Sequence, residues 1–141
     1  MADMSVLGTA PVGAWCPSLD TAGDGTTTLT DLSGNGNNGT LTNMDAATDW
    51  TADTDNGGIR ALDFDGINDL ITTPAIARPS SWSVSVWIKP TAHNSQGFVF
   101  AGTGPPNYFG LCAFASSIRI YESNGVSSQI RSVESFNSTN Y

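Results

Sequence analysis

Residues 31–39 combine oxygen-bearing side chains with three glycines, in the order Asp-Leu-Ser-Gly-Asn-Gly-Asn-Asn-Gly. Calcium binds about six to eight oxygens from carboxylates, side-chain amides and backbone carbonyls. Asp31, Asn35 and Asn38 carry such oxygens, and the glycines allow the backbone to fold tightly around an ion. Asp63, further along the chain, can add a second carboxylate. These four residues predict a calcium site, with Asp31 as its best single ligand.

A hydrogen-bonded loop is the alternative for the same residues. Asp and Asn side chains often stabilise turns by bonding to their own backbone. The spacing of the acids and amides also differs from that of an EF-hand loop. Both interpretations of residues 31–39 stay open at the level of the sequence.

A tryptophan lies on the polar side of the best predicted strand, residues 81–89. Apolar residues at the even positions 82 to 88 alternate with serines and Trp87 at the odd positions, which predicts one buried and one polar face. On the polar face the indole of Trp87 can stack on a sugar ring, and burial beneath a covering loop is the alternative. Tyr108, as a rim aromatic, is the second predicted ligand-binding residue.

Residues that could carry out catalysis are sparse. His93 is the only histidine and lies in a polar linker, so a zinc site is not expected. No Gly-x-Ser-x-Gly nucleophile elbow occurs. A glycosidase needs two carboxylates roughly 5 to 10 Å apart, but the only glutamates, Glu122 and Glu134, have no acids at neighbouring positions. No catalytic residue is predicted, and the chain is expected not to be an enzyme.

The charge of the chain excludes two classes of partner. The 141 residues include 13 acids and 5 bases, a formal charge of −8, with Lys89 as the only lysine. A surface for nucleic acid or for anionic membrane needs clustered Lys and Arg, so neither is expected. No apolar run is long enough to span a bilayer, and no signal peptide is visible. Cys16 and Cys112 can form one disulfide or stay as two free thiols.

Short apolar runs separated by turn residues predict an all-β fold, because no segment has a sustained period of 3.6 residues. We expect residues 1–11 to form an N-terminal arm and residues 12–141 to form one domain. Residues 65–68 (Asp-Gly-Ile-Asn) and the pair Asn124-Gly125 each predict a hairpin between the strands on either side. The predicted strands are residues 12–16, 26–32, 39–41, 61–64, 70–73, 81–89, 97–101, 108–115, 118–122 and 126–133.

Three stretches resemble motifs of one family, the bacterial laminin-G-like group of the concanavalin A-like lectin/glucanase superfamily. Residues 31–41 are similar to its Asp-x-Ser-Gly-Asn-Gly-Asn-x-Gly loop. Residues 61–71 (Ala-Leu-Asp-Phe-Asp-Gly-Ile-Asn-Asp-Leu-Ile) are similar to its Ala-Leu-x-Phe-Asp-Gly-x-Asp-Asp-Tyr-Val hairpin. Residues 81–90 (Ser-Trp-Ser-Val-Ser-Val-Trp-Ile-Lys-Pro) are similar to its Ser-Phe-Thr-Ile-Ser-Ala-Trp-Val-Lys-Pro strand. In this order the motifs cover about residues 12–133.

The resemblance implies a jelly-roll β-sandwich of two curved antiparallel sheets, often with bound calcium. It also implies a role in carbohydrate binding, adhesion or particle architecture. We therefore expect a recognition module for a glycan or cell-surface polysaccharide, located outside the cell or on a cell or virion surface. The alternatives are a structural or decoration protein of a virion or surface assembly without a sugar ligand and, third, a glycoside hydrolase.

The resemblance also implies that the sandwich is incomplete. Family members continue beyond the position of Asn140-Tyr141 into a Trp-His-x-Val-Ala strand, a Tyr-Val-Asp-Gly hairpin and an Ile-Asp-Glu-Val strand. None of these motifs occurs in this sequence. Open sheet edges and an uncovered apolar face around Trp82 then predict either that the chain is part of a longer protein or that other protein subunits complete its sheets.

Overall fold

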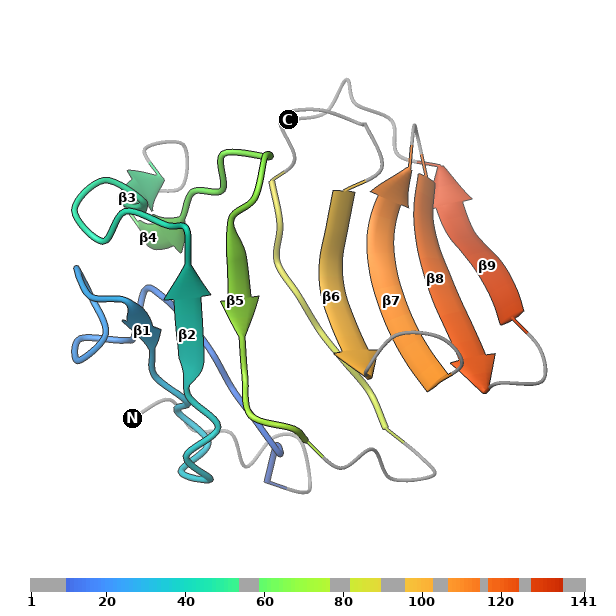
Figure 1. The fold of residues 1–141 in the computed structure, drawn as a ribbon, viewed down its shortest axis with the longest axis horizontal. Helices are drawn as coiled ribbons and strands as arrows, with labels where there is room; N and C mark the ends of the chain where they lie inside the picture. The colour runs from blue at the N-terminus through green and yellow to red at the C-terminus, as the bar shows by residue number, and fades with distance from the viewer. Residues whose placement is uncertain are drawn as a thin grey trace. The chain divides into compact units, whose positions relative to one another are not determined.

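The computed structural model describes residues 10–53, 59–76, 82–89, 96–102, 107–114, 117–124 and 128–135 of the 141-residue chain. Every regular element in these ranges is a β-strand, and every strand pairing is antiparallel (Figure 1). This confirms the predicted all-β class. The chain divides into two compact units, Met1–Ile76 and Ala77–Tyr141, each with its own sheets. The described ranges include no helix that is long and apolar enough to cross a membrane.

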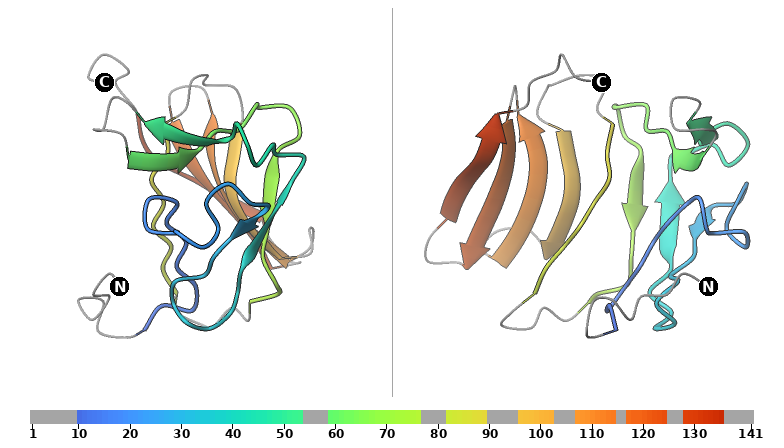
Figure 2. Two further views of the ribbon diagram at one scale, coloured as in Figure 1. Left: turned by 90° about the vertical axis from the view of Figure 1, so that its left-hand side faces the viewer. Right: turned by 180° about the vertical axis from the view of Figure 1, so that it is seen from behind.

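The first unit contains a three-stranded sheet and a two-stranded ribbon. The sheet has the order β1–β2–β5 and consists of β1 (Thr28–Leu29), β2 (Gly39–Thr42) and β5 (Leu70–Thr72). The ribbon pairs β3 (Trp50–Asp53) with β4 (Ile59–Leu62). Figures 1 and 2 show the ribbon at the end of the sheet toward which β2 runs.

Sheet and ribbon share one hydrophobic core. Along β2, Gly39 and Leu41 are buried whereas Thr40 and Thr42 are exposed, as expected for a strand with one face on a core. The core contains side chains from all five strands, because it consists of Leu29, Leu41, Met44 and Trp50, with Trp15, Leu62 and Ile71 packed against it. The core therefore fixes the ribbon to the sheet within this unit.

The segment between β4 and β5 is not the predicted hairpin. β4 pairs with β3 and β5 pairs with β2, so residues 63–69 connect the ribbon to the sheet. The turn itself forms where it was predicted. The carboxylate of Asp65 accepts N–H bonds from Ile67 (2.7 Å) and Asn68 (3.3 Å), and Gly66 has a φ of 73°. The prediction is wrong because a tight turn bends the chain without deciding which strands pair.

The second unit contains a four-stranded sheet of order β6–β7–β8–β9. Its strands are β6 (Gln96–Gly102), β7 (Asn107–Phe114), β8 (Ser117–Asn124) and β9 (Ser128–Ser135). They correspond to the four strands predicted between residues 97 and 133. The antiparallel pairing of β8 with β9 agrees with the hairpin predicted at Asn124, although the next residue, Gly125, lies outside the described residues.

The inner and outer strands of this sheet differ in regularity. β7 and β8 pair without interruption along their whole length. In β6 the register passes over Phe98, and in β9 it passes over Val133, so both outer strands have an extra residue, as in a β-bulge. A bulge bends a strand and increases its local twist.

Two predicted strands are not strands in the structure. Residues 12–16 lie outside the sheets, where side chains of residues 31–39 bind their backbone. Residues 82–89, the described part of the predicted strand 81–89, follow an extended path in Figure 1 without being assigned to a strand. Alternation of side chains indicates an extended backbone, but it does not supply a neighbouring strand to pair with. The jelly-roll sandwich, and a single domain over residues 12–141, stay predictions.

Candidate functional site: an exposed tryptophan and a hydrogen-bonded loop

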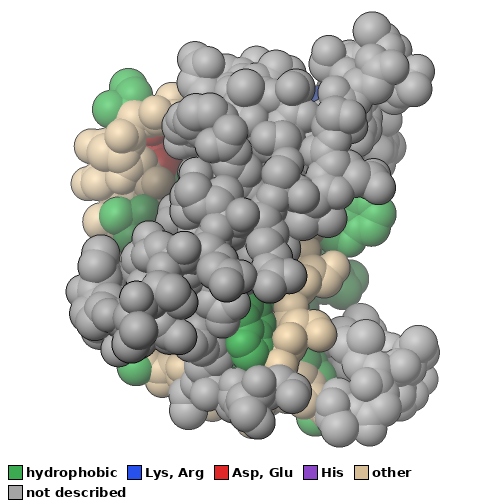
Figure 3. All heavy atoms as spheres, turned by 90° about the vertical axis from the view of Figure 1, so that its right-hand side faces the viewer, with side chains coloured by type: hydrophobic (Ala, Val, Ile, Leu, Met, Phe, Trp, Pro, Cys, Tyr) green, Lys and Arg blue, Asp and Glu red, His purple; other side chains and the backbone are tan. Residues whose placement is uncertain are grey.

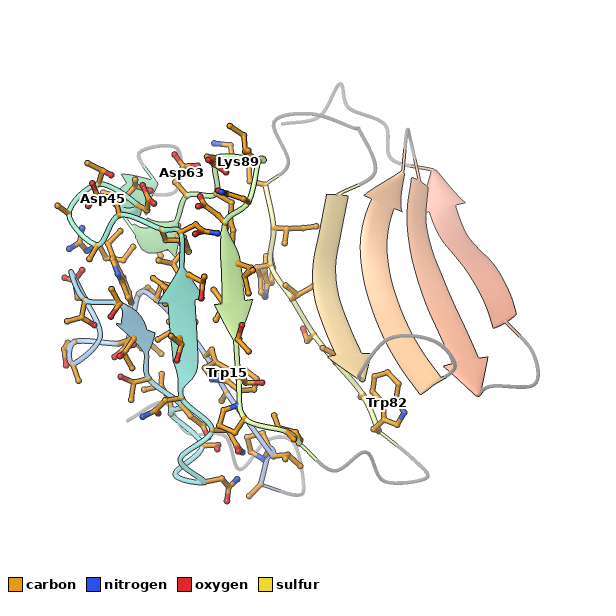
Figure 4. The ribbon with its side chains drawn as sticks, viewed as in Figure 1. Trp15, Asp45, Asp63, Trp82 and Lys89 are labelled. Atoms are coloured by element: carbon orange, nitrogen blue, oxygen red, sulfur yellow. The ribbon has the colours of Figure 1, made fainter. Side chains whose placement is uncertain are left out.

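Residues 82–89 carry the predicted sugar-stacking side chain. The apolar residues at positions 82, 84, 86 and 88 are 37–44% exposed, whereas Trp87 is 96% exposed. Figure 4 labels Trp82 and Lys89 at the two ends of this segment. Trp87 is thus more exposed than its apolar neighbours, but none of these side chains is buried, so the structure does not show the predicted buried face. The indole of Trp87 lies open to solvent and is available to stack on an apolar ring.

The structure describes the other candidate residues, Tyr108, His93 and Cys16, to different extents. Tyr108 pairs with Ser123 in the β7–β8 ladder, but its side chain lies outside the described residues, as does His93. Cys16 is a free thiol, and its Sγ lies 3.1 Å from the hydroxyl of Ser18. Of the two alternatives for Cys16, the structure has the free thiol.

The carboxylate of Asp31 is the centre of the loop formed by residues 31–39. It is 6% exposed, and its oxygens accept N–H bonds from Ala14 (3.0 Å), Ser33 (2.9 Å) and Asn37 (2.9 Å). Burial alone would raise the pKa of Asp31, but the hydrogen bonds from Ser33, Ala14 and Asn37 outweigh it and lower the pKa to about 2. The charged carboxylate of Asp31 thus stabilises residues 31–39 and connects them to the backbone at Ala14.

Two asparagines of the loop bind the backbone of residues 11 and 12. The amide nitrogen of Asn35 donates to the carbonyls of Pro11 (3.0 Å) and Val12 (3.1 Å), and the amide nitrogen of Asn37 donates to Val12 (2.8 Å). In the opposite direction, the indole N–H of Trp15 donates to the carbonyl of Asn37 at 2.9 Å. These bonds explain why residues 12–16 lie against the loop and not in a sheet.

The four predicted calcium ligands do not converge. Oδ1 of Asn38 accepts the N–H of Asp31 at 2.9 Å, and Asn35 turns its amide nitrogen toward two carbonyls. Asp63 is exposed, and Figure 4 shows it near the end of β2, whereas residues 31–38 lead into the start of β2 at Gly39. Within the part of the chain that the structure describes, no three His, Cys, Asp or Glu residues are grouped to hold a metal ion. The loop has the hydrogen-bonded arrangement, and calcium binding stays a prediction.

A second buried carboxylate, that of Asp20, was missed by the sequence analysis. It is 2% exposed and accepts N–H bonds from Gly23 (2.7 Å) and Thr30. Burial would raise the pKa of Asp20, but hydrogen bonds from Thr30, Gly23 and Ala22 lower it below the usual value. The spacing Asp-x-x-Gly is a signal for a turn. Burial of that turn beneath β1 has no comparable signal in the sequence.

Comparisons with protein-family profiles, with curated proteins and with solved structures gave no match to this chain. The laminin-G-like resemblance therefore rests on the three sequence motifs alone. The exposed Trp87 and the loop centred on Asp31 are the two features of the described residues from which a function can be argued.

Proposed function

We propose that this chain is a non-catalytic recognition module that binds a glycan through the indole of Trp87. The observation that carries the proposal is the 96% exposure of that side chain. An indole offers a large, rigid apolar face, and the C–H face of a pyranose ring is a suitable partner for it. Ser83 and Ser85, which are also exposed, lie at alternate positions of the same segment and can supply hydroxyl groups beside the ring.

The architecture that we propose is the jelly-roll sandwich implied by the sequence motifs. Its support is the all-β character of both units and the antiparallel pairing in each sheet. In such a sandwich, residues 82–89 would form a strand with Trp87 on its outer face. A glycan on the surface of a cell or particle would then be the partner, with the protein itself outside the cell or on such a surface.

The placement of the two glutamates favours binding over glycoside hydrolysis. Glu134 in β9 pairs with Ile118, which lies four residues before Glu122 on β8. At about 3.3 Å per residue, this places the backbones of the two glutamates roughly 13 Å apart along the strands. Paired carboxylates of glycosidases lie roughly 5 to 10 Å apart. We therefore propose no catalytic role for them.

The test is a glycan array followed by calorimetry with the best-bound neutral oligosaccharide. We expect Trp87→Ala to weaken binding at least about tenfold, the loss of a stacking contact, and Trp87→Phe to retain most of the affinity. Ile67→Ala is the matched control, because Ile67 is also an exposed apolar residue, at 84%. Binding to no glycan, or equal affinity of Trp87→Ala and the native chain, would overturn the proposal.

One observation favours a second candidate, an assembly protein without a sugar ligand. Large apolar side chains reach the surface of the described residues at many positions, and Figure 3 shows hydrophobic groups in several separate places. Where such side chains form a contiguous patch, the surface is suited to contact other subunits. An array without any binding, together with self-association of the chain, would favour this candidate.

A further inference from the structure

Two Asn-Gly pairs lie three residues apart in the loop, Asn35-Gly36 and Asn38-Gly39. Asparagine before glycine is chemically labile, because glycine has no Cβ to hinder its backbone nitrogen from reaching the asparagine side chain. The two pairs have the same local chemistry, so any difference in their reactivity must come from the fold.

The pair Asn38-Gly39 is held in place. Oδ1 of Asn38 accepts the N–H of Asp31 at 2.9 Å. Gly39 is buried in β2, opposite Leu29 of β1. The position of a Cβ on Gly39 would lie 2.6 Å from Cγ2 of Ile71. The backbone nitrogen of Gly39 therefore has little freedom to move toward the side chain of Asn38.

The pair Asn35-Gly36 is open. Both residues are exposed, and a Cβ built on Gly36 would have no atom within 4 Å. Gly36 has a φ of 75°, a conformation that glycine adopts without strain. Among the described residues, the side chain of Asn35 bonds through its amide nitrogen to Pro11, Val12 and the hydroxyl of Ser33, and its oxygen accepts no bond.

We propose that Asn35 is a site of spontaneous deamidation, and that the reaction removes the bonds that Asn35 donates to Pro11 and Val12. The backbone nitrogen of Gly36, after losing its proton to hydroxide, attacks Cγ of Asn35. The bond from Cγ to Nδ2 breaks, and the nitrogen leaves as ammonia with a proton from water. Water then opens the cyclic imide at either carbonyl, which gives aspartate or isoaspartate at position 35. No oxidant or reductant is needed.

The product cannot replace the bonds of the amide. In the native loop, Nδ2 of Asn35 donates to the carbonyls of Pro11 at 3.0 Å and Val12 at 3.1 Å. A carboxylate has no donor, so its oxygens would face two carbonyl oxygens and be repelled by them. Asn37 would keep its own bond to Val12, so the loss is confined to the contacts that Asn35 makes.

The first test follows the reaction in the intact chain. The protein is kept in mildly alkaline buffer and then digested with a protease that cleaves before aspartate, which yields residues 31–44 as one peptide containing both pairs. Aspartate at position 35 creates a new cleavage site, and isoaspartate gives an uncut peptide with a shifted retention time. We expect Asn35 to react severalfold faster than Asn38 in the folded protein, and the two rates to become similar in urea. Equal rates in the folded protein, or a faster reaction at Asn38, would overturn the proposal.

The second test compares two variants with the same change of charge. Asn35→Asp loses the bonds donated to the carbonyls of Pro11 and Val12, whereas Asn38→Asp keeps an oxygen that can accept the N–H of Asp31. We expect Asn35→Asp to melt several degrees below Asn38→Asp, as measured by circular dichroism. Equal melting temperatures would contradict the loss of the stabilising bonds from Asn35 to Pro11 and Val12. If Asn35→Asp does not fold, the melting temperature of the native protein is measured before and after deamidation. We expect it to fall by several degrees, and an unchanged value would contradict the proposal.

Discussion

Asp31 shows how one carboxylate can organise a loop of small polar residues. Its oxygens bind N–H groups at positions 14, 33 and 37, which lie far enough apart in the sequence to draw two segments together. The sequence predicted Asp31 as the best single calcium ligand of the loop. It did not decide between an ion and N–H groups as the partner, because a carboxylate and several amides suit both.

The low pKa of Asp31 makes the stability of the fold depend on pH. An unperturbed Asp has a pKa of about 4, and that of Asp31 is lowered to about 2. The folded state therefore favours the charged form, and this stabilisation is complete above about pH 4 and is lost as the pH falls toward 2. We expect Asp31→Asn to lower the free energy of unfolding at neutral pH. We also expect this free energy to fall less in the variant than in the native chain as the pH drops from about 4 to about 2. Urea unfolding across this range measures both effects, with the exposed Asp63→Asn as control. The same acid dependence in all three proteins would contradict the assignment.

Gly23 provides a second prediction at a single residue. A Cβ at this position would meet the carboxylate of Asp20 and the carbonyl of Thr28, neither of which can move without losing its bonds. We expect Gly23→Ala to lower the free energy of unfolding by about 1–3 kcal/mol, the usual cost of forcing extra atoms into a packed site. Thr21→Ala, at an exposed position of the same turn, should cost much less. Similar denaturant midpoints for the two variants would count against this account of the turn.

At the scale of elements, the sequence predicted strands better than it predicted their partners. β6 to β9 were found because their runs are long and the turn at Asn124 separates two of them clearly. β3 was missed because Trp50–Asp53 is short and lies in a polar stretch, where only the burial of Trp50 in the core marks it as a strand. The strand predicted at residues 12–16 is wrong because side-chain amides of a loop distant in the sequence bind the backbone there. Hydrogen bonds between residues so far apart in the sequence leave no local pattern from which they could be predicted.

Metal removal distinguishes the two interpretations of the loop formed by residues 31–39. An ion that binds only the folded state raises the melting temperature, and a chelator then lowers it. Asp31 and Asn38 bind N–H groups, and a loop held by these bonds alone gives the same melt with calcium and with chelator. A melting temperature that falls on chelation in the native chain, but not in Asp31→Ala, would instead establish the calcium site that the sequence predicts.

At the scale of the molecule, the described residues bury few large apolar side chains and expose many. Surfaces of this kind tend to associate in water. We expect the 141-residue chain to form oligomers at micromolar concentration, which size-exclusion chromatography with light scattering will detect. Dilution or mild detergent should shift the population toward the monomer. A monodisperse monomer with a sharp cooperative melt would show that the exposed apolar groups have found partners within the chain.

The extra residues in β6 and β9 bear on how such an association can grow. A flat, regular outer strand offers its unpaired N–H and C=O groups to the next molecule, and repeated addition of this kind builds cross-β fibrils. In this sheet only β7 and β8 pair without a register shift, and the two outer strands each have one shift, at Phe98 in β6 and at Val133 in β9. A strand of a second molecule would have to follow the same bend to pair along the whole of either strand. We therefore expect these bulges to hinder repeated extension of the sheet, so that association of the chain would end at a finite size.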